Sequence, residues 1–347
     1  MSGRTGKRYL VTGGAGFIGS NYADRLLGRG EAVTILDNLG RAGAEKNLAW
    51  LRERHGEGSF RLVAGDVRDY PLVVETVRTA DVIIHLAAQV AVTTSVDDPR
   101  TDFEINAAGT VNVLEAARLS NLDPVILYAS TNKVYGEMEA TPLVELETRW
   151  DYADLPNGVP ESQPIDFHSP YGCSKGAGDQ YVRDFHRIYG LQTVVFRQGC
   201  IYGPRQFGVE DQGWVAWFMI AALLDREITI YGDGKQVRDL CHVEDLLDAY
   251  DAAVERIDTA AGRIYNIGGG KANTLSIWAE FGPRLEEWIG APVEVARNPA
   301  WRLGDQRVNY SDLTRAGADL DWTPKIGIAE GIPGLLDWIR QNISLFE

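Results

Sequence analysis

Short apolar runs alternate with helical patterns from residue 8 to about 200 of the chain. These runs lie at residues 9–11, 32–36, 60–63, 82–86, 125–128 and 193–196. Strands that alternate with helices indicate a parallel sheet with helices on both faces. We therefore predict an α/β fold, a Rossmann-type doubly wound parallel sheet, whose ligands bind beyond the carboxyl ends of the strands.

A different pattern begins after Gly203. It predicts an aromatic-rich helix at 214–224, then a short strand at 228–231 and more helix. We interpret this part as a smaller α/β C-terminal lobe that binds substrate. Within its first helix, Trp214 and Trp217 are expected in the core rather than at a ligand.

These patterns suggest two domains. The first is expected at 1–200 and also receives a later segment around 235–270, whereas residues 201–347 belong mostly to the substrate lobe. Between the patterns, residues 142–167 are acidic, contain proline and show no clear periodicity. Long loops of this kind often cover a site, so we expect an excursion over the surface here.

Composition and charge narrow the function. Of 347 residues, 45% are hydrophobic and 24% charged, as in globular proteins. The 49 acidic residues outnumber the 34 basic ones and give a net charge of -15. Because a nucleic-acid surface needs concentrated basic residues, we expect no nucleic-acid partner. The three cysteines lack the paired spacing of a metal site, so no metal is predicted.

No apolar run approaches the length of a membrane span, and the start of the chain lacks the apolar stretch of a signal peptide. We therefore expect no membrane association and a cytoplasmic location.

A glycine-rich turn gives the first chemical signal. Gly13, Gly16 and Gly19 directly follow the first apolar run. Glycines there let the backbone approach a pyrophosphate, and the helix that follows offers its free amides to that anion. Asp37 ends the second strand, about twenty residues further on, where a carboxylate accepts the hydroxyls of an adenosine ribose. This favours NAD over NADP, although nearby Arg41 offers a contact for a 2'-phosphate.

A tyrosine and a lysine give the second signal. Tyr171 precedes Lys175 by one helical turn, so the ammonium is expected to lower the pKa of the phenol toward neutrality. Ser130 and Thr131 follow the fifth strand, where a hydroxyl stands beside the tyrosine and binds the same substrate oxygen. A phenolate paired with a hydroxyl is suited to proton transfer during hydride chemistry.

With these motifs the chain resembles the extended short-chain dehydrogenase/reductases that act on nucleotide sugars. The resemblance covers nearly the whole length, and the matching segments are 12–19, 37–39, 65–67, 85–88, Asn106, 171–175, 202–205, 232–234 and 238–245. It implies bound NAD, a nucleotide-sugar substrate and a homodimer formed by two helices that flank the sheet. Apolar positions around 111–114 and 177–182 are candidates for that interface, and they would equally serve as core.

The resemblance and the strand ends together define a predicted cofactor site. Asp66 and residues 87–89 are expected to border the adenine and the nicotinamide ribose. The predicted cofactor-binding residues are Gly13, Gly16, Phe17, Ile18, Gly19, Asp37, Asn38, Asp66, Val67, Leu86, Ala87, Ala88, Gln89, Asn106, Tyr171 and Lys175.

One branch of the family is especially similar. Residues 130–136, 166–171, 211–214 and 305–308 resemble the CDP-paratose 2-epimerases, also called CDP-tyvelose epimerases. That branch implies inversion at carbon 2 through a transient ketone, with catalytic Thr131, Tyr171 and Lys175. The alternatives are a UDP-hexose 4-epimerase, a nucleotide-sugar dehydrogenase or reductase, and a non-catalytic protein that senses NAD.

Two departures from the family bear on the substrate. Its sugar 4,6-dehydratases carry Asp-Glu after the threonine, whereas this chain has Asn132 and Lys133, which disfavours elimination of water. Many 4-epimerases place an asparagine where this chain has Cys200. The predicted substrate-binding residues are Ser130, Thr131, Asn132, His168, Cys200, Arg238 and Arg302, with Arg307 as a rival to the two arginines because a guanidinium pairs well with phosphate oxygens.

Overall fold

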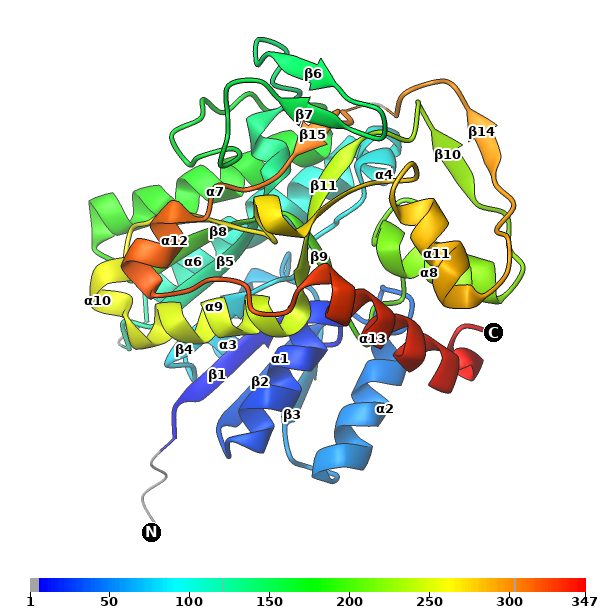
Figure 1. The fold of residues 1–347 in the computed structure, drawn as a ribbon. Coiled ribbons are helices and arrows are strands. Elements are labelled where there is room, and N and C mark those ends of the chain that lie inside the picture. Colours follow the sequence, from blue (N-terminus) through cyan, green and yellow to red (C-terminus); the bar gives the residue numbers. More distant parts are fainter. Residues whose placement is uncertain (1–5, 121, 303) are drawn as a thin grey trace.

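A seven-stranded parallel sheet forms the centre of the protein (Figure 1). The structure, a computed structural model, describes residues 6–120, 122–302 and 304–347. The strands of this sheet are β1 Arg8–Thr12, β2 Ala32–Asp37, β3 Arg61–Ala64, β4 Val82–His85, β5 Val125–Thr131, β8 Thr193–Gln198 and β12 Ile264–Ile267. Their spatial order is β12-β8-β5-β4-β1-β2-β3, and all neighbours are parallel. The predicted doubly wound sheet is confirmed, and its order reverses between β1 and β4.

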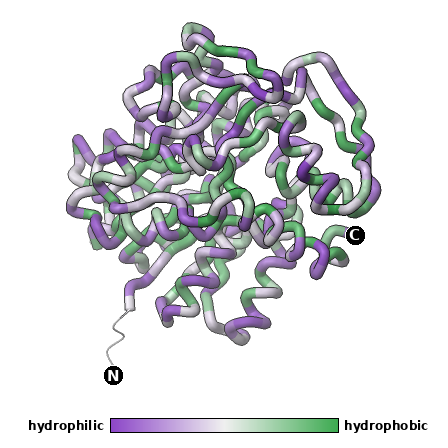
Figure 2. Tube along the Cα trace, in the orientation of Figure 1, coloured by the Kyte–Doolittle hydropathy of each residue, from purple (hydrophilic) through white to green (hydrophobic). Residues whose placement is uncertain are grey.

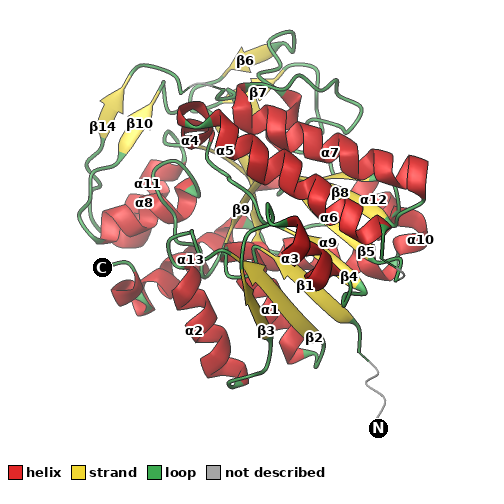
Figure 3. Ribbon diagram, turned by 180° about the vertical axis from the view of Figure 1, so that it is seen from behind, coloured by secondary structure: helices red, strands yellow, loops and turns green. Residues whose placement is uncertain are grey.

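Helices cover both faces of this sheet, which explains why its central strands are apolar throughout. Every residue of β4 and β8 is buried. Figure 1 shows the face covered by α1 Phe17–Gly28, α2 Ala44–His55, α9 Val243–Glu255, α10 Ile257–Ala260 and α12 Thr314–Leu320. Figure 3 shows the opposite face, covered by α3 Tyr70–Val77, α6 Gly109–Arg118 and α7 Ser169–Tyr189, with the shorter elements α4 Val92–Asp97, α5 Pro99–Phe103 and η1 Glu104–Ala108 before α6. Apolar residues concentrate along the central strands between these layers (Figure 2).

A smaller lobe packs beyond the carboxyl ends of the sheet. Its strands are β9 Cys200–Tyr202, β11 Val237–His242, β13 Thr274–Ser276 and β15 Val308–Asn309 in one mixed sheet, and β10 Thr229–Tyr231 with β14 Ala296–Asn298 in a parallel pair. Its helices are α8 Trp214–Leu223, α11 Phe281–Ile289 and α13 Ile328–Gln341, with short turns η3 Lys271–Asn273 and η4 Ile343–Leu345. Trp214 and Trp217 pack against the apolar core of this lobe, as predicted.

Two segments differ in detail from the predicted pattern. β5 extends beyond the predicted run through Thr131, and the 3-10 turn η2 Asn132–Tyr135 follows at once. The predicted surface excursion contains a hairpin of β6 Leu143–Glu145 and β7 Trp150–Tyr152. The hydroxyl of Tyr152 donates a hydrogen bond of 2.7 Å to the carbonyl of Val308, so the hairpin is fastened to the smaller lobe.

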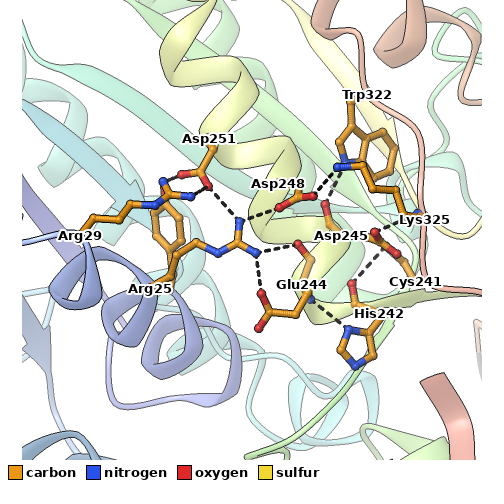
Figure 4. A network of polar contacts seen from close by, with 11 residues as sticks. Arg25, Arg29, Cys241, His242, Glu244, Asp245, Asp248, Asp251, Trp322 and Lys325 are labelled. Atoms are coloured by element: carbon orange, nitrogen blue, oxygen red, sulfur yellow. Dashed lines mark hydrogen bonds and ion pairs between the residues drawn. The ribbon is translucent and has the colours of Figure 1, made fainter. Parts of the chain in front are cut away.

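An ionic network joins α1 to α9 (Figure 4). Arg25 of α1 lies 2.8 Å from carboxylate oxygens of both Asp248 and Asp251 of α9. Arg29 also pairs with Asp251, and Lys325 pairs with Asp248 at 2.9 Å. These contacts tie the segment that follows β11 to the first helix of the chain.

Every helix within the described ranges is too short or too polar to cross a membrane. Across the same ranges, histidine, cysteine and acidic side chains form no group of three or more suited to a metal ion.

Candidate active site

The predicted catalytic residues lie together in a cavity of about 290 Å³ beyond the end of β5. We call it the reaction cavity, and Thr131, Tyr171 and Lys175 all line it. Thr131 is the last residue of β5. Tyr171 lies in the first turn of α7, and Lys175 follows one turn later on the same face. All three side chains are buried.

Burial controls the titration of this pair. It raises the pKa of Tyr171 to about 12, against the opposing effect of a hydrogen bond from Thr131. It lowers the pKa of Lys175 to about 7, although Asp102 and Asp179 act in the opposite direction. An amine with that pKa is uncharged where the phenol titrates, so the expected lowering of the Tyr171 pKa by Lys175 is absent from the chain alone.

Lys175 lies over an aromatic ring, and a buried polar cluster includes its neighbour Ser174. The Lys175 Nζ lies 4.3 Å from the ring centre of Tyr128, a cation–π distance. Behind it, the Asn106 side-chain nitrogen donates to the Gln89 carbonyl (3.0 Å), to Asp102 (3.0 Å) and to Ser174 (3.1 Å). Asn106 in turn accepts the Gln89 amide at 2.9 Å.

Asn106 and Gln89 form a hydrogen-bonded cluster beside the cavities. Both were predicted to contact the cofactor, yet neither lines the reaction cavity or the cavity described next. Their hydrogen bonds instead fix the backbone after β4 against α7. The predicted cofactor residues Tyr171 and Lys175 line the reaction cavity only.

A second cavity, of about 190 Å³, lies over the glycine turn and the ends of β2 and β3. We call it the cofactor cavity. The predicted residues that line it are Gly13, Gly16, Phe17, Ile18, Gly19, Asp37, Asn38, Asp66, Val67, Leu86, Ala87 and Ala88. Phe17, Ile18, Leu86 and Ala88 also line the reaction cavity, so the two cavities are continuous.

The backbone geometry of the glycine-rich turn explains why glycine occurs there. Gly13 has φ +70°, a conformation that residues with a Cβ rarely adopt. A Cβ there would stand 2.8 Å from the backbone nitrogen of Ala87. The amide of Gly16 donates to the Gly13 carbonyl at 3.1 Å and closes the turn. The helix α1 begins directly after it, with its free amides toward the cavity.

The carboxylates of the cofactor cavity are held by amide groups and an arginine. Asp37 accepts the backbone amides of Ala15 (2.9 Å) and Leu39 (2.8 Å), one on each oxygen. Each oxygen keeps a further lone pair for a ribose hydroxyl. Arg68 holds the pKa of Asp66 at about 2, so that side chain is ionised. This cradle of glycines, amides and a carboxylate fits a dinucleotide.

A third cavity, of about 220 Å³, contains the predicted anion-binding arginines and is called the outer cavity. Arg238 donates to the Val237 carbonyl at 2.7 Å and pairs with Asp305. Arg302 donates to the Glu210 carbonyl (3.0 Å) and carboxylate (3.1 Å). Both guanidinium groups are therefore oriented by residues of the smaller lobe.

Two aromatic contacts refine the predicted anion site. Arg302 lies 4.2 Å from the ring centre of Tyr231, which also lines the outer cavity. Arg307 does not line that cavity and lies between Trp150 (4.9 Å) and Trp301 (5.2 Å). Arg238 and Arg302 therefore line the outer cavity, whereas Arg307 does not.

The remaining predicted substrate residues divide into those inside and those outside the reaction cavity. Ser130 and Cys200 line it. The Ser130 hydroxyl, however, donates to buried Asp179 at 2.8 Å, and burial raises the pKa of Cys200 to about 12 and keeps it a neutral thiol. His168 lies outside, with its Nε2 3.4 Å from a carboxylate oxygen of Glu137.

Sequence reasoning missed the partners of Asn132 and Lys133. The Asn132 side chain donates to Asn309 at 2.7 Å, and Lys133 donates to the Gly304 carbonyl at 3.0 Å. These partners lie far away in sequence, and residues 305–308 had been noted only as part of a resemblance. Trp214, which packs against the core as predicted, also lines the outer cavity.

Comparisons with known proteins agree with this geometry. A family model described as the NAD dependent epimerase/dehydratase family matches residues 9–268. A CDP-paratose 2-epimerase of Salmonella typhi is 45% identical over 338 residues, which cover 95% of this chain and 98% of that one. A UDP-glucose 4-epimerase of Mycolicibacterium smegmatis is 36% identical over 336 residues, covering 96% and 99% of the two chains.

A solved structure extends the likeness to three dimensions. A double mutant of a dTDP-glucose 4,6-dehydratase from Streptomyces venezuelae, solved with NAD bound, matches this chain with a TM-score of 0.83. The two are 30% identical, and the match covers 97% of this chain and 98% of the other.

Proposed function

The chain belongs to the NAD-dependent epimerase/dehydratase family, and on that premise we propose that it inverts carbon 2 of a nucleotide-activated deoxyhexose, as in the conversion of CDP-paratose to CDP-tyvelose. The observation that carries this proposal is the likeness to a CDP-paratose 2-epimerase, which is 45% identical along nearly the whole chain. The reaction cavity supports epimerisation over dehydration, because Asn132 and Lys133 follow Thr131 in its wall.

NAD binds in the cofactor cavity in this proposal. Gly13, Gly16 and Gly19 let the pyrophosphate approach the start of α1, and Asp37 accepts hydroxyls of the adenosine ribose. When bound, NAD would supply hydride chemistry beside Tyr171, and its oxidised ring would add a positive charge to that of Lys175.

The protein's own residues move the proton. Tyr171, as phenolate, takes the proton of the sugar hydroxyl while Thr131 positions that oxygen. Tyr171 returns the same proton once the flat ketone has presented its other face and been reduced. Lys175 holds the nicotinamide ribose and, when charged, stabilises the phenolate. The cofactor ends the cycle in its starting state, so no added redox partner is consumed.

A 4-epimerase is the nearest rival. The M. smegmatis UDP-glucose 4-epimerase, at 36% identity, favours that reading. Such an enzyme would use Thr131, Tyr171 and Lys175 in the same roles on a sugar whose fourth carbon faces the nicotinamide. The residues of the reaction cavity serve either carbon, so the substrate must decide.

One experiment separates the candidates. The purified protein is incubated with CDP-paratose in deuterated water without added NAD, and the ring protons are followed by NMR. We expect inversion at carbon 2 without uptake of deuterium, because hydride returns from bound cofactor. Conversion of UDP-glucose to UDP-galactose instead would identify a 4-epimerase. In a parallel incubation with added cofactor, net consumption of NAD or NADPH would identify a dehydrogenase or reductase, and binding of NAD without turnover a sensor.

We also propose a homodimer through α6 and α7. Of the apolar positions named for this interface, Val113, Leu114 and Val182 are buried core residues within the chain, the other role expected for them. The exposed apolar side chains on these elements are Leu119, Tyr181, Ile188 and Tyr189. Apolar side chains gathered in this way are typical of protein interfaces.

The interface is tested by changing Tyr181 and Ile188 to glutamate together. We expect the mass measured by light scattering to fall from that of a dimer to that of the 38.3 kDa chain, because two buried charges oppose association. Val144→Glu, at an exposed apolar position in the β6–β7 hairpin, is the matched control and should leave the mass unchanged. A wild-type protein that is monomeric would contradict the proposal.

A further inference from the structure

We infer that Lys133 positions the substrate by binding its diphosphate where the reaction cavity meets the outer cavity. The inference rests on the proposed nucleotide-sugar substrate but not on the identity of the base or on which sugar carbon is inverted. It assigns a function to a residue that the motif analysis treated only as a missing carboxylic acid.

The location of Lys133 supports this role. Its side chain lines both the reaction cavity and the outer cavity, and within the described ranges no other lysine or arginine lines both. A nucleotide sugar that places its sugar beside Tyr171 and its nucleoside beside Arg302 must pass through this junction. The diphosphate connects those two parts, so it is the group that would lie nearest Lys133.

The backbone of Lys133 is tied to the catalytic threonine. Its amide donates to the Thr131 hydroxyl oxygen at 3.2 Å at the start of η2. An anion held by the side chain is therefore fixed relative to the oxygen that positions the sugar hydroxyl. Anchoring the diphosphate there sets how far the sugar ring enters the reaction cavity.

The charges around Lys133 leave its ammonium available. Its Nζ donates to the neutral Gly304 carbonyl at 3.0 Å and lies 3.8 Å from the carboxylate of Asp305. That carboxylate already pairs with Arg238, so one aspartate stands between two cations. An ammonium carries three donors. The Gly304 carbonyl takes one and Asp305 attracts a second, so at least one on Lys133 remains for a ligand. By contrast, Arg302 is engaged by Glu210.

A second consequence concerns pH. Burial and nearby Arg238 lower the pKa of Lys133 to about 8, although Asp305 and Glu137 act to raise it. The amine is therefore charged below about pH 8 and neutral above it. Diphosphate affinity of the wild type should accordingly decline as the pH rises through this value, whereas affinity for the uncharged nucleoside should not.

Calorimetric titration of the NAD-loaded protein tests the inference. Cytidine diphosphate and cytidine are each titrated into the wild type, Lys133→Met and Lys133→Arg. We expect Lys133→Met to weaken cytidine diphosphate binding by about 10- to 100-fold, the effect of losing one charge-assisted hydrogen bond, and to leave cytidine binding unchanged. Lys133→Arg should restore most of the affinity and remove its decline above pH 8.

Lys271→Met is the matched control. The Lys271 Nζ also donates to a backbone carbonyl, that of Pro156, at 3.0 Å, but Lys271 lines none of the three cavities. This variant should bind both ligands as the wild type does. Thermal unfolding and NAD content of each variant confirm that the fold is intact.

The possible outcomes separate this inference from the proposed function. If the wild type prefers uridine diphosphate, the proposed base is wrong, and the uridine pair of ligands tests Lys133 in the same way. Lys133→Met with wild-type affinity for the diphosphate would overturn the inference, as would an equal loss for diphosphate and nucleoside. A wild type that binds no nucleoside diphosphate would overturn both.

Discussion

The cofactor side and the substrate side of the cleft are assembled from the chain in different ways. Apart from Gln212, every residue that lines the cofactor cavity lies between positions 13 and 105, at successive strand ends of one βαβ series. The outer cavity combines Lys133 with 210–214, 229–231, Arg302, Gly304 and Asp305 from the other lobe. One side is therefore local in sequence, and the other exists only after the two lobes have packed.

The two sides also differ in which atoms form them. On the cofactor side the backbone is in close contact, since a Cβ on Gly13 would meet the nitrogen of Ala87 at 2.8 Å. On the substrate side, ion pairs such as those of Arg238 and Arg302 set the shape. Substitutions can change the side chains of an ion pair more easily than they can change a close contact between two backbone segments. This difference fits relatives with different named activities that match the chain over nearly its full length.

The largest expected effect is a loss of catalytic rate on changing Tyr171, which lies where the cofactor side and the substrate side meet. Replacing Tyr171 by phenylalanine removes the hydroxyl that exchanges the substrate proton. We expect kcat to fall by about 10²- to 10⁴-fold, the usual contribution of general acid–base catalysis. Bound NAD, measured by release and absorbance, should stay at the wild-type level because Tyr171 does not line the cofactor cavity. Retained turnover would assign the proton transfer to another group.

A smaller effect is expected from one methyl group on the cofactor side. Gly13→Ala forces a side chain into a left-handed conformation and toward Ala87. We expect the free energy of unfolding to drop by about 1–2 kcal/mol and the NAD content to fall with it. Chemical denaturation and cofactor release provide the two measurements.

Gly28→Ala is the control for that substitution. Gly28 ends α1 and has open space where a Cβ would be placed, so its replacement should be neutral or slightly stabilising. If Gly13→Ala behaves in the same way, the cofactor side tolerates side chains and the contrast between the two sides fails.

The same contrast explains how much the sequence could predict. The glycine turn and the residue Asp37 were predictable because a βαβ unit places them by local geometry alone. The α7 pair of Tyr171 and Lys175 was predictable from helical spacing. The fold class followed from the alternation of apolar runs and helical patterns, which the seven-stranded sheet confirms.

The rest depended on contacts that spacing does not encode. The prediction could not anticipate that Asn106 would bind Gln89 rather than line a cavity, because that depends on packing between α7 and the end of β4. The pKa of Tyr171 is raised by burial, which the spacing between Tyr171 and Lys175 does not reveal. Asp305 pairs with Arg238 and lies near Lys133 only after the two lobes have packed together, so the sequence alone does not reveal these contacts.

Ser130 provides the smallest and most discriminating test of the comparison. The sequence predicts a substrate contact, whereas in the structure its hydroxyl donates to Asp179, a buried carboxylate that also pairs with Arg197 at 2.9 Å. Ser130→Ala should therefore lower the free energy of unfolding by about 1–2 kcal/mol, because a buried carboxylate loses one hydrogen bond. KM should remain within about threefold of the wild type, since a factor of three corresponds to less than 1 kcal/mol. A larger rise in KM with unchanged stability would indicate that the Ser130 hydroxyl contacts the substrate. Denaturation and steady-state kinetics of the same variant therefore distinguish a substrate contact from a structural hydrogen bond.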